Sequence, residues 1–206
     1  MAETAPTSVA GEIPRAWGNP RAAMRRQMSI GDWEGRALTY LLIGAVLWSL
    51  ANLPVANARG GLSDDAAGNS LGVLIAARVF QIAIGVLMTT LVLLLVAAFT
   101  RLVARLFGGQ GSWSSARLAL GWSFLACAPL ALLAAVVTAA ALGIGTPFLT
   151  EAAGLATLMA QLVLLYVWSA SLAEAEGFTR TWPVVLTFAL LVGGAWIGFG
   201  LLLAQG

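Results

Sequence analysis

The chain has 206 residues, of which 60% are hydrophobic and 10% are charged, and its formal net charge at pH 7 is +2. Globular domains carry about 25% charged residues, so this composition excludes a soluble enzyme, a disordered tail and a coiled coil. The sequence has no histidine and one cysteine, Cys127, which excludes an internal disulfide, His-dependent catalysis and most metal sites. We therefore expect a polytopic membrane protein that is not an enzyme and has no catalytic, cofactor or metal site.

Five stretches of the sequence are long and apolar enough to cross a membrane as helices, which takes about 20 residues for a core roughly 30 Å thick. They cover residues 37–56, 71–99, 118–142, 155–172 and 184–203. The predicted fold is therefore an all-α membrane protein. A short, partly disordered N-terminal arm (residues 1–31) precedes a bundle of five transmembrane helices (residues 32–206).

The arginines predict how the chain is threaded through the membrane. All 11 basic residues are arginines, and nine of them lie before the first predicted span or in the connections that follow the second and fourth spans. Only Arg59 and Arg78 belong to the opposite side. The positive-inside rule then places the N-terminus in the cytoplasm and, after five crossings, the C-terminus outside.

The arm divides into two parts. Residues 1–18 mix Ala, Pro, Thr, Ser and Gly without periodicity, so we expect disorder there. Asn19 and Pro20 are typical of a helix start, with Asn as the cap and Pro in the first helical position. In the helix that follows, Met24 and Met28 share one face.

Three arginines of this basic amphipathic helix are candidate contacts for anionic lipid headgroups: Arg21, Arg25 and Arg26. A basic amphipathic helix can lie in the headgroup layer, where each basic residue contributes about 1 kcal/mol. The same charges could instead only fix the topology, or could bind a partner protein.

Arg78 is a candidate intramembrane charge, seven residues into the second span. Such a charge is by default a functional-site hypothesis, and its candidate partners are Asp64, Asp65 and Glu151. The alternative is that the helix begins after residue 77, so that Arg78 reaches the interface as an anchor.

Other span residues favour helix packing. Pro129 should kink the third span, and Gln161 can hydrogen-bond a neighbouring helix, as can several Thr and Ser residues. In the fifth span Gly194 and Gly198 form a GxxxG pair that allows two helices to approach closely, within the chain or in a homo-oligomer. The absence of a central Asp, Glu, Lys or His argues against an ion-coupled transporter.

One connection is glycine-rich, at residues 108–113. The chain has no lysine, so this loop is not a phosphate-binding loop, and we expect neither a nucleotide nor a nucleic acid as a partner. Glu174 and Glu176 lie on the same predicted side as Arg101, Arg105 and Arg117. Exposed ion pairs between these loops would contribute little to stability.

Several short motifs, in this order, resemble those of the Yip family of five-span membrane proteins, and especially its bacterial members. The motifs are a proline followed by basic residues, a Gly-x-Gly-Ser-aromatic loop, a Ser…Pro-Leu stretch and a pair of aromatic segments. In this chain they are Asn19-Pro20-Arg21 with Arg25-Arg26, Gly109-Gln110-Gly111-Ser112-Trp113, Ser123 with Pro129, and Tyr166-Val-Trp168 with Gly177-Phe178-Thr-Arg180.

The resemblance implies a non-enzymatic integral protein of a bacterial inner membrane, with a membrane-organising or scaffold role. The short arm argues against the recruitment of small GTPases that eukaryotic relatives are linked to. An alternative is an accessory subunit that stabilises a larger inner-membrane complex, such as an energy-transducing one. A small-solute channel or transporter is a third hypothesis.

Overall fold

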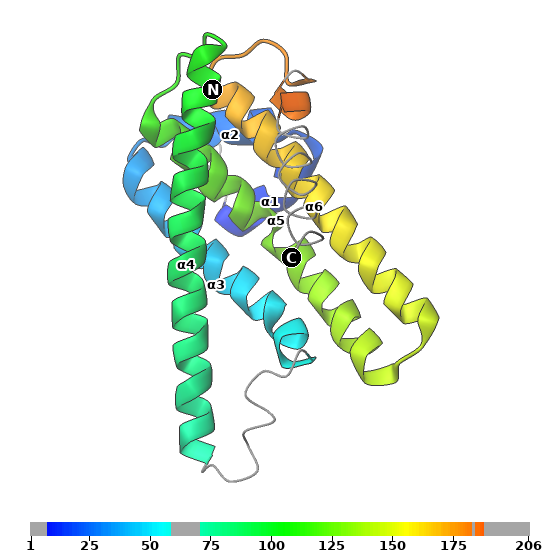
Figure 1. The fold of residues 1–206 in the computed structure, drawn as a ribbon. Helices are drawn as coiled ribbons and strands as arrows, with labels where there is room; N and C mark the ends of the chain where they lie inside the picture. The colour runs from blue at the N-terminus through cyan, green and yellow to red at the C-terminus, as the bar shows by residue number, and fades with distance from the viewer. Residues whose placement is uncertain (1–7, 59–70, 183, 188–206) are drawn as a thin grey trace, which may run out of the picture.

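The structure is a computed structural model that describes residues 8–58, 71–182 and 184–187. Within these ranges the regular structure is helical. The longer helices are α1 (Val9–Gly18), α2 (Pro20–Ser29), α3 (Trp33–Ala58), α4 (Leu71–Leu106), α5 (Trp113–Ile144) and α6 (Pro147–Ala175). Figure 1 shows the short α1 and α2 beside the long helices.

Helices α3 to α6 are each long and apolar enough to cross a membrane. Each contains one of the first four predicted spans and extends beyond it. At 1.5 Å per residue, the 36 residues of α4 measure about 54 Å, well beyond a hydrocarbon core of roughly 30 Å. The all-α membrane fold is confirmed with four candidate spans. Most of the predicted fifth span, 184–203, lies outside the described residues.

The four long helices alternate in direction, so that the start of α3, the end of α4, the start of α5 and the end of α6 lie together. Arg117 at the start of α5 pairs with Glu34 at the start of α3. Arg101 near the end of α4 pairs with Glu176 directly after α6. We call this end of the bundle the arm end, because α1 and α2 pack on it. Helix α5 is central: α3 and α6 pack extensively against it, and α4 packs much less (Figure 1).

The core is concentrated toward the arm end. Residues 118–128 of α5 and 167–173 of α6 are all buried, whereas exposed side chains interrupt the remainder of both helices. Small residues permit this close packing. A Cβ on Gly121 of α5 would lie 2.8 Å from the carbonyl oxygen of Ala37 in α3, so only glycine lets the two backbones approach at this point.

The arm is more ordered than its sequence predicts. Residues 9–18 form α1, so the expectation of disorder is wrong from Val9 onward. The predicted start of the second helix is confirmed, because the Asn19 side chain accepts a hydrogen bond from the Ala22 N–H and Pro20 is the first residue of α2. Met24 is fully buried in the core cluster and Met28 packs against it. The apolar face of α2 therefore contacts protein.

Pro129 lies within α5, which continues through it. Because proline has no N–H, the carbonyl of Leu125 has no partner one turn ahead. The carbonyls on either side of it accept hydrogen bonds from indoles: Trp17 of α1 donates to Ala126 O at 3.0 Å, and Trp48 of α3 donates to Phe124 O at 3.2 Å. The proline is itself exposed, so the packing occurs in the turn before it.

The polar residues of the spans mostly do not join helices to one another. The hydroxyls of Thr90, Ser123, Thr138 and Thr157 each donate to a carbonyl four residues earlier in their own helix. Gln161 is exposed on α6 and makes no hydrogen bond to another described residue, so the predicted packing role has no support there. The GxxxG pair, Gly194 and Gly198, lies outside the described residues.

Candidate functional site

Three of the short motifs, far apart in the sequence, meet at the arm end. They are residues 19–21 at the start of α2, the glycine loop 109–113 before α5, and residues 177–180 after α6. Two acidic residues, Glu174 and Glu176, connect these three motifs. We call the three motifs, the two acidic residues and Arg101 the arm-end cluster.

Glu176 and Arg101 form the buried centre of the cluster. Arg101 Nη1 donates to Glu176 Oε2 at 2.9 Å, and the two side chains are 11% and 0% exposed. The same carboxylate oxygen accepts the Gly111 N–H at 3.0 Å, while Arg101 Nη2 donates to Gly111 O. The sequence predicts that Arg101 and Glu176 lie on the same side of the membrane. The expectation that ion pairs between these loops are exposed is wrong for this pair.

The geometry of the loop explains its two glycines. A Cβ on Gly109 would lie 2.6 Å from Glu176 Oε2, and a Cβ on Gly111 would lie 2.6 Å from Ala175 O. The Gln110 N–H donates to Glu176 O at 3.0 Å, so the loop lies directly against the end of α6. Ser112 then caps α5 in a capping box with Ser115. The Gly-x-Gly-Ser sequence is thus a packing and capping unit.

The carboxyl of Glu176 has a raised pKa. Burial raises the pKa by more than the charge of Arg101 and the hydrogen bond from the Gly111 N–H lower it. Its second oxygen, Oε1, and the Nε of Arg101 are buried and have no hydrogen-bond partner in the described part of the chain. Unpaired buried polar atoms of this kind are costly, and in native proteins they mark strained or functional positions.

Arg21 fastens α2 to the end of α6. Its Nε donates to Glu174 Oε2 at 2.9 Å, and its Nη1 and Nη2 donate to Thr179 O at 2.9 Å and Phe178 O at 2.6 Å. Arg25 Nε lies 3.0 Å from the other oxygen of Glu174. Of the predicted lipid contacts, Arg21 is thus engaged within the protein, its side chain 29% exposed.

The remaining basic residues of the arm are more accessible. Arg25 is 70% exposed and Arg26 is 46% exposed. Arg26 and Arg15 bind the two oxygens of Glu12, a buried residue of α1. The sequence alone does not identify Glu12 and Trp17 as residues that hold the arm in place. The spacing of Glu12 and Arg15 by three residues nevertheless fits an ion pair on one helical face.

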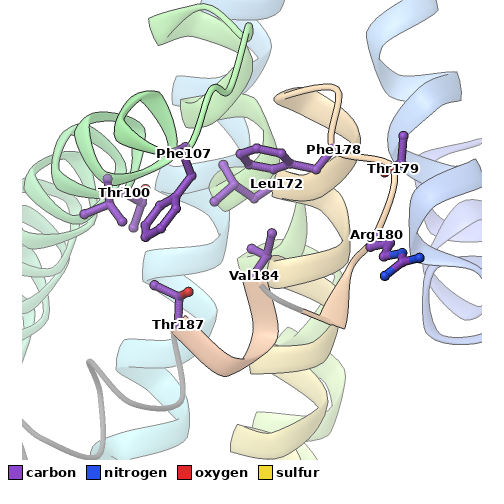
Figure 2. Close-up of a pocket in the computed structure, with 10 residues that line it drawn as sticks. Thr100, Phe107, Leu172, Phe178, Thr179, Arg180, Val184 and Thr187 are labelled. Carbon is purple, nitrogen blue, oxygen red and sulfur yellow. The ribbon is translucent and has the colours of Figure 1, made fainter.

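A cavity of about 330 Å³ adjoins the cluster between α4, α6 and the segment after α6. The side chains of Phe107, Leu172, Phe178 and Val184 surround it, and the guanidinium of Arg180 points away from its centre (Figure 2). The lining is mainly apolar, so the cavity suits a hydrocarbon group. Among the described residues no group of three His, Cys, Asp or Glu side chains could hold a metal ion.

Arg78 lies in the second turn of α4, which begins at Leu71. The prediction that the helix begins only after residue 77 is therefore wrong. Arg78 Nη1 donates to Gln81 Oε1 at 2.9 Å. Glu151, one of the three predicted partners, makes no ion pair within the described part of the chain, and the other two, residues 64 and 65, fall outside it.

Comparison with known proteins identifies the family. A family model described as the Yip1 domain matches residues 16–202. No curated protein matches the chain, and no solved structure does. The match includes all the motifs on which the resemblance rests and, with the four apolar helices, identifies an integral membrane protein. The chain belongs to the Yip1 domain family.

Proposed function

We propose that this protein is a non-enzymatic scaffold that organises a bacterial inner membrane, with its arm end in the cytoplasm and its C-terminus outside. The observation that carries the proposal is the fixed position of the arm. Helices α1 and α2 join the core of the membrane-spanning bundle through Ala16, Ala23 and Met24, so the charges of the arm are held in a set place beside the spans.

The charges of the arm suit an anionic lipid surface. Arg15, Arg21, Arg25 and Arg26 share two carboxylates, Glu12 and Glu174, so the group keeps an excess of positive charge. The side chains of Arg15 and Arg25 are more than half exposed, and that of Arg26 is 46% exposed. Basic groups near a membrane surface attract anionic lipids by about 1 kcal/mol each, and salt weakens the attraction.

Lipid enrichment around the reconstituted full-length protein tests this proposal. Energy transfer from the tryptophans to a labelled lipid should be stronger for phosphatidylglycerol than for phosphatidylcholine, and the difference should shrink with salt. Replacing Arg15, Arg25 and Arg26 together by glutamine should reduce the difference, while the matched lysine triple variant should keep it. Equal transfer to both lipids in the native protein would refute the lipid part of the proposal.

Purification in mild detergent tests the scaffold role itself. A protein that works through lipids and its own copies should give a native mass of one or more copies of this chain with bound lipid. A stoichiometric second protein would instead support the accessory-subunit hypothesis. Solute flux through proteoliposomes that depends on Gln81 would support a channel and contradict the scaffold.

A further inference from the structure

A second cavity lies between α3 and α4, in the part of the bundle away from the arm end. Its volume is about 290 Å³. Polar side chains enter it from both helices, namely Ser49 and Asn52 from α3 and Gln81 and Thr89 from α4. Polar groups between membrane-crossing helices are costly unless they have partners, so four of them around one cavity indicate a site.

The stacked rings of Trp48 and Phe124, with centroids 4.7 Å apart, also line this cavity. Because α3 runs away from the arm end and α4 runs toward it, Trp48 and Thr89 are the lining residues nearest the arm end on their helices. Gln81 lies at the opposite limit of the cavity on α4. The aromatic pair therefore lies toward the arm end of the cavity, and Gln81 lies at its other end.

The polar groups of the cavity retain free hydrogen-bonding capacity. Gln81 Oε1 accepts from Arg78, which leaves the amide N–H groups of Gln81. Asn52 Nδ2 donates to Trp48 O at 2.8 Å, which leaves its carbonyl oxygen. Unlike Thr90, whose hydroxyl donates within α4, Ser49 and Thr89 make no hydrogen bond to another described residue. The cavity thus offers both donors and acceptors.

Arg78 supplies a positive charge beside Gln81, just beyond the residues that line the cavity. It lies three residues from Gln81 on the same helix, and the two side chains are hydrogen-bonded. None of the residues that line the cavity is acidic, and no carboxylate pairs with Arg78 among the described residues. A guanidinium that keeps free N–H groups is well suited to a phosphate, which it can bind through two parallel hydrogen bonds.

We propose that this cavity binds the headgroup of an anionic phospholipid, with the phosphate on Arg78 and a hydroxyl-bearing headgroup between Asn52, Gln81 and Thr89. A lipid is favoured over a soluble phosphate ester because the cavity lies between two spans. The neighbouring side chains Val79 and Phe80 are 62% and 68% exposed and so present an apolar surface to acyl chains. The site is separate from the basic arm and does not depend on it.

Native mass spectrometry of the full-length protein with added lipid tests the site. Phosphatidylglycerol should be retained about tenfold more than phosphatidylcholine, and Arg78→Gln should lower that retention about tenfold, the effect of one charge-assisted hydrogen bond or more. Arg78→Lys should restore part of the retention. Arg105→Gln, an exposed arginine at the other end of the same helix, is the matched control and should leave it unchanged.

The Ser49→Ala, Thr89→Val double variant keeps Arg78 and removes only two hydroxyls, so it tests the headgroup contact even if Arg78→Gln fails to fold. It should retain several-fold less phosphatidylglycerol at an unchanged melting temperature. Excess glycerol phosphate should not displace the lipid; displacement would show that a soluble phosphate ester is the ligand. Equal retention of both lipids, or retention that no cavity variant lowers, would overturn the proposal.

Discussion

Arg101 and Glu176, 75 residues apart in the sequence, form an ion pair that is buried at the arm end, with 2.9 Å between Nη1 and Oε2. Replacing Arg101 by methionine keeps much of the side-chain volume but leaves the Glu176 carboxylate buried without its cation. Breaking a buried pair in this way costs about 3–5 kcal/mol. We expect a markedly lower melting temperature in detergent, measured by intrinsic tryptophan fluorescence.

Arg105→Met is the matched control for this variant. Arg105 lies one turn further along α4 and is exposed, so its loss should change the free energy of unfolding by no more than about 0.5 kcal/mol. If both variants melted at the same temperature, the pair would not hold the arm end together.

The raised pKa of Glu176 predicts how stability depends on pH. Its ordinary value is 4.5, and burial raises it in the folded state. Between these two values the folded state binds more protons than the unfolded state, so the contribution of this group to stability falls as the pH rises through the window. Glu176→Gln should remove this contribution. The melting temperature of the native protein relative to the variant should therefore be highest at the acid end, and a difference that grows with pH would contradict this.

The first four spans could be predicted from the sequence, because an apolar stretch of about 20 residues in lipid commonly forms a helix. Their ends could not. Helix α5 begins at Trp113 instead of residue 118, because Ser112 and Ser115 form a capping box and the surrounding protein buries the next turns. Hydropathy measures transfer into lipid and does not distinguish lipid from a protein interior.

Helix α1 could not be predicted, because its local sequence opposes it. Gly11 and Pro14 both disfavour helix in isolation. Tertiary contacts override that preference: Ala16 is fully buried and Trp17 bonds to a carbonyl of α5. The arm-end cluster also depends on tertiary contacts that the sequence does not reveal. Arg101 and Glu176 could be placed on one side by counting spans, but their burial depends on how closely the glycine loop approaches the end of α6.

Gly111 should not tolerate a side chain. A Cβ there would lie 2.6 Å from the backbone oxygen of Ala175 and 2.8 Å from Cδ of Glu176. The backbone oxygen and the buried ion pair cannot easily move away from the added methyl group. Gly111→Ala should therefore lower the free energy of unfolding by about 1–3 kcal/mol and lower the melting temperature. Gly143→Ala, at a helical site with nothing within 4 Å, should have no effect or raise it slightly. Equal destabilisation by both variants would exclude the steric explanation.

Arg21 should decide whether the arm stays docked. Its guanidinium joins α2 to Glu174 and to two backbone carbonyls after α6, so Arg21→Ala removes three contacts and leaves Phe178 O and Thr179 O without this donor. Hydrogen–deuterium exchange of the full-length protein should then accelerate across α1 and α2 while the middle of α5 stays protected. Arg25→Ala, which also loses a contact to Glu174 but is mostly exposed, should cost only about 0–1 kcal/mol and leave exchange in the arm nearly unchanged. Faster exchange in the Arg25 variant than in the Arg21 variant would show that a different contact holds the arm.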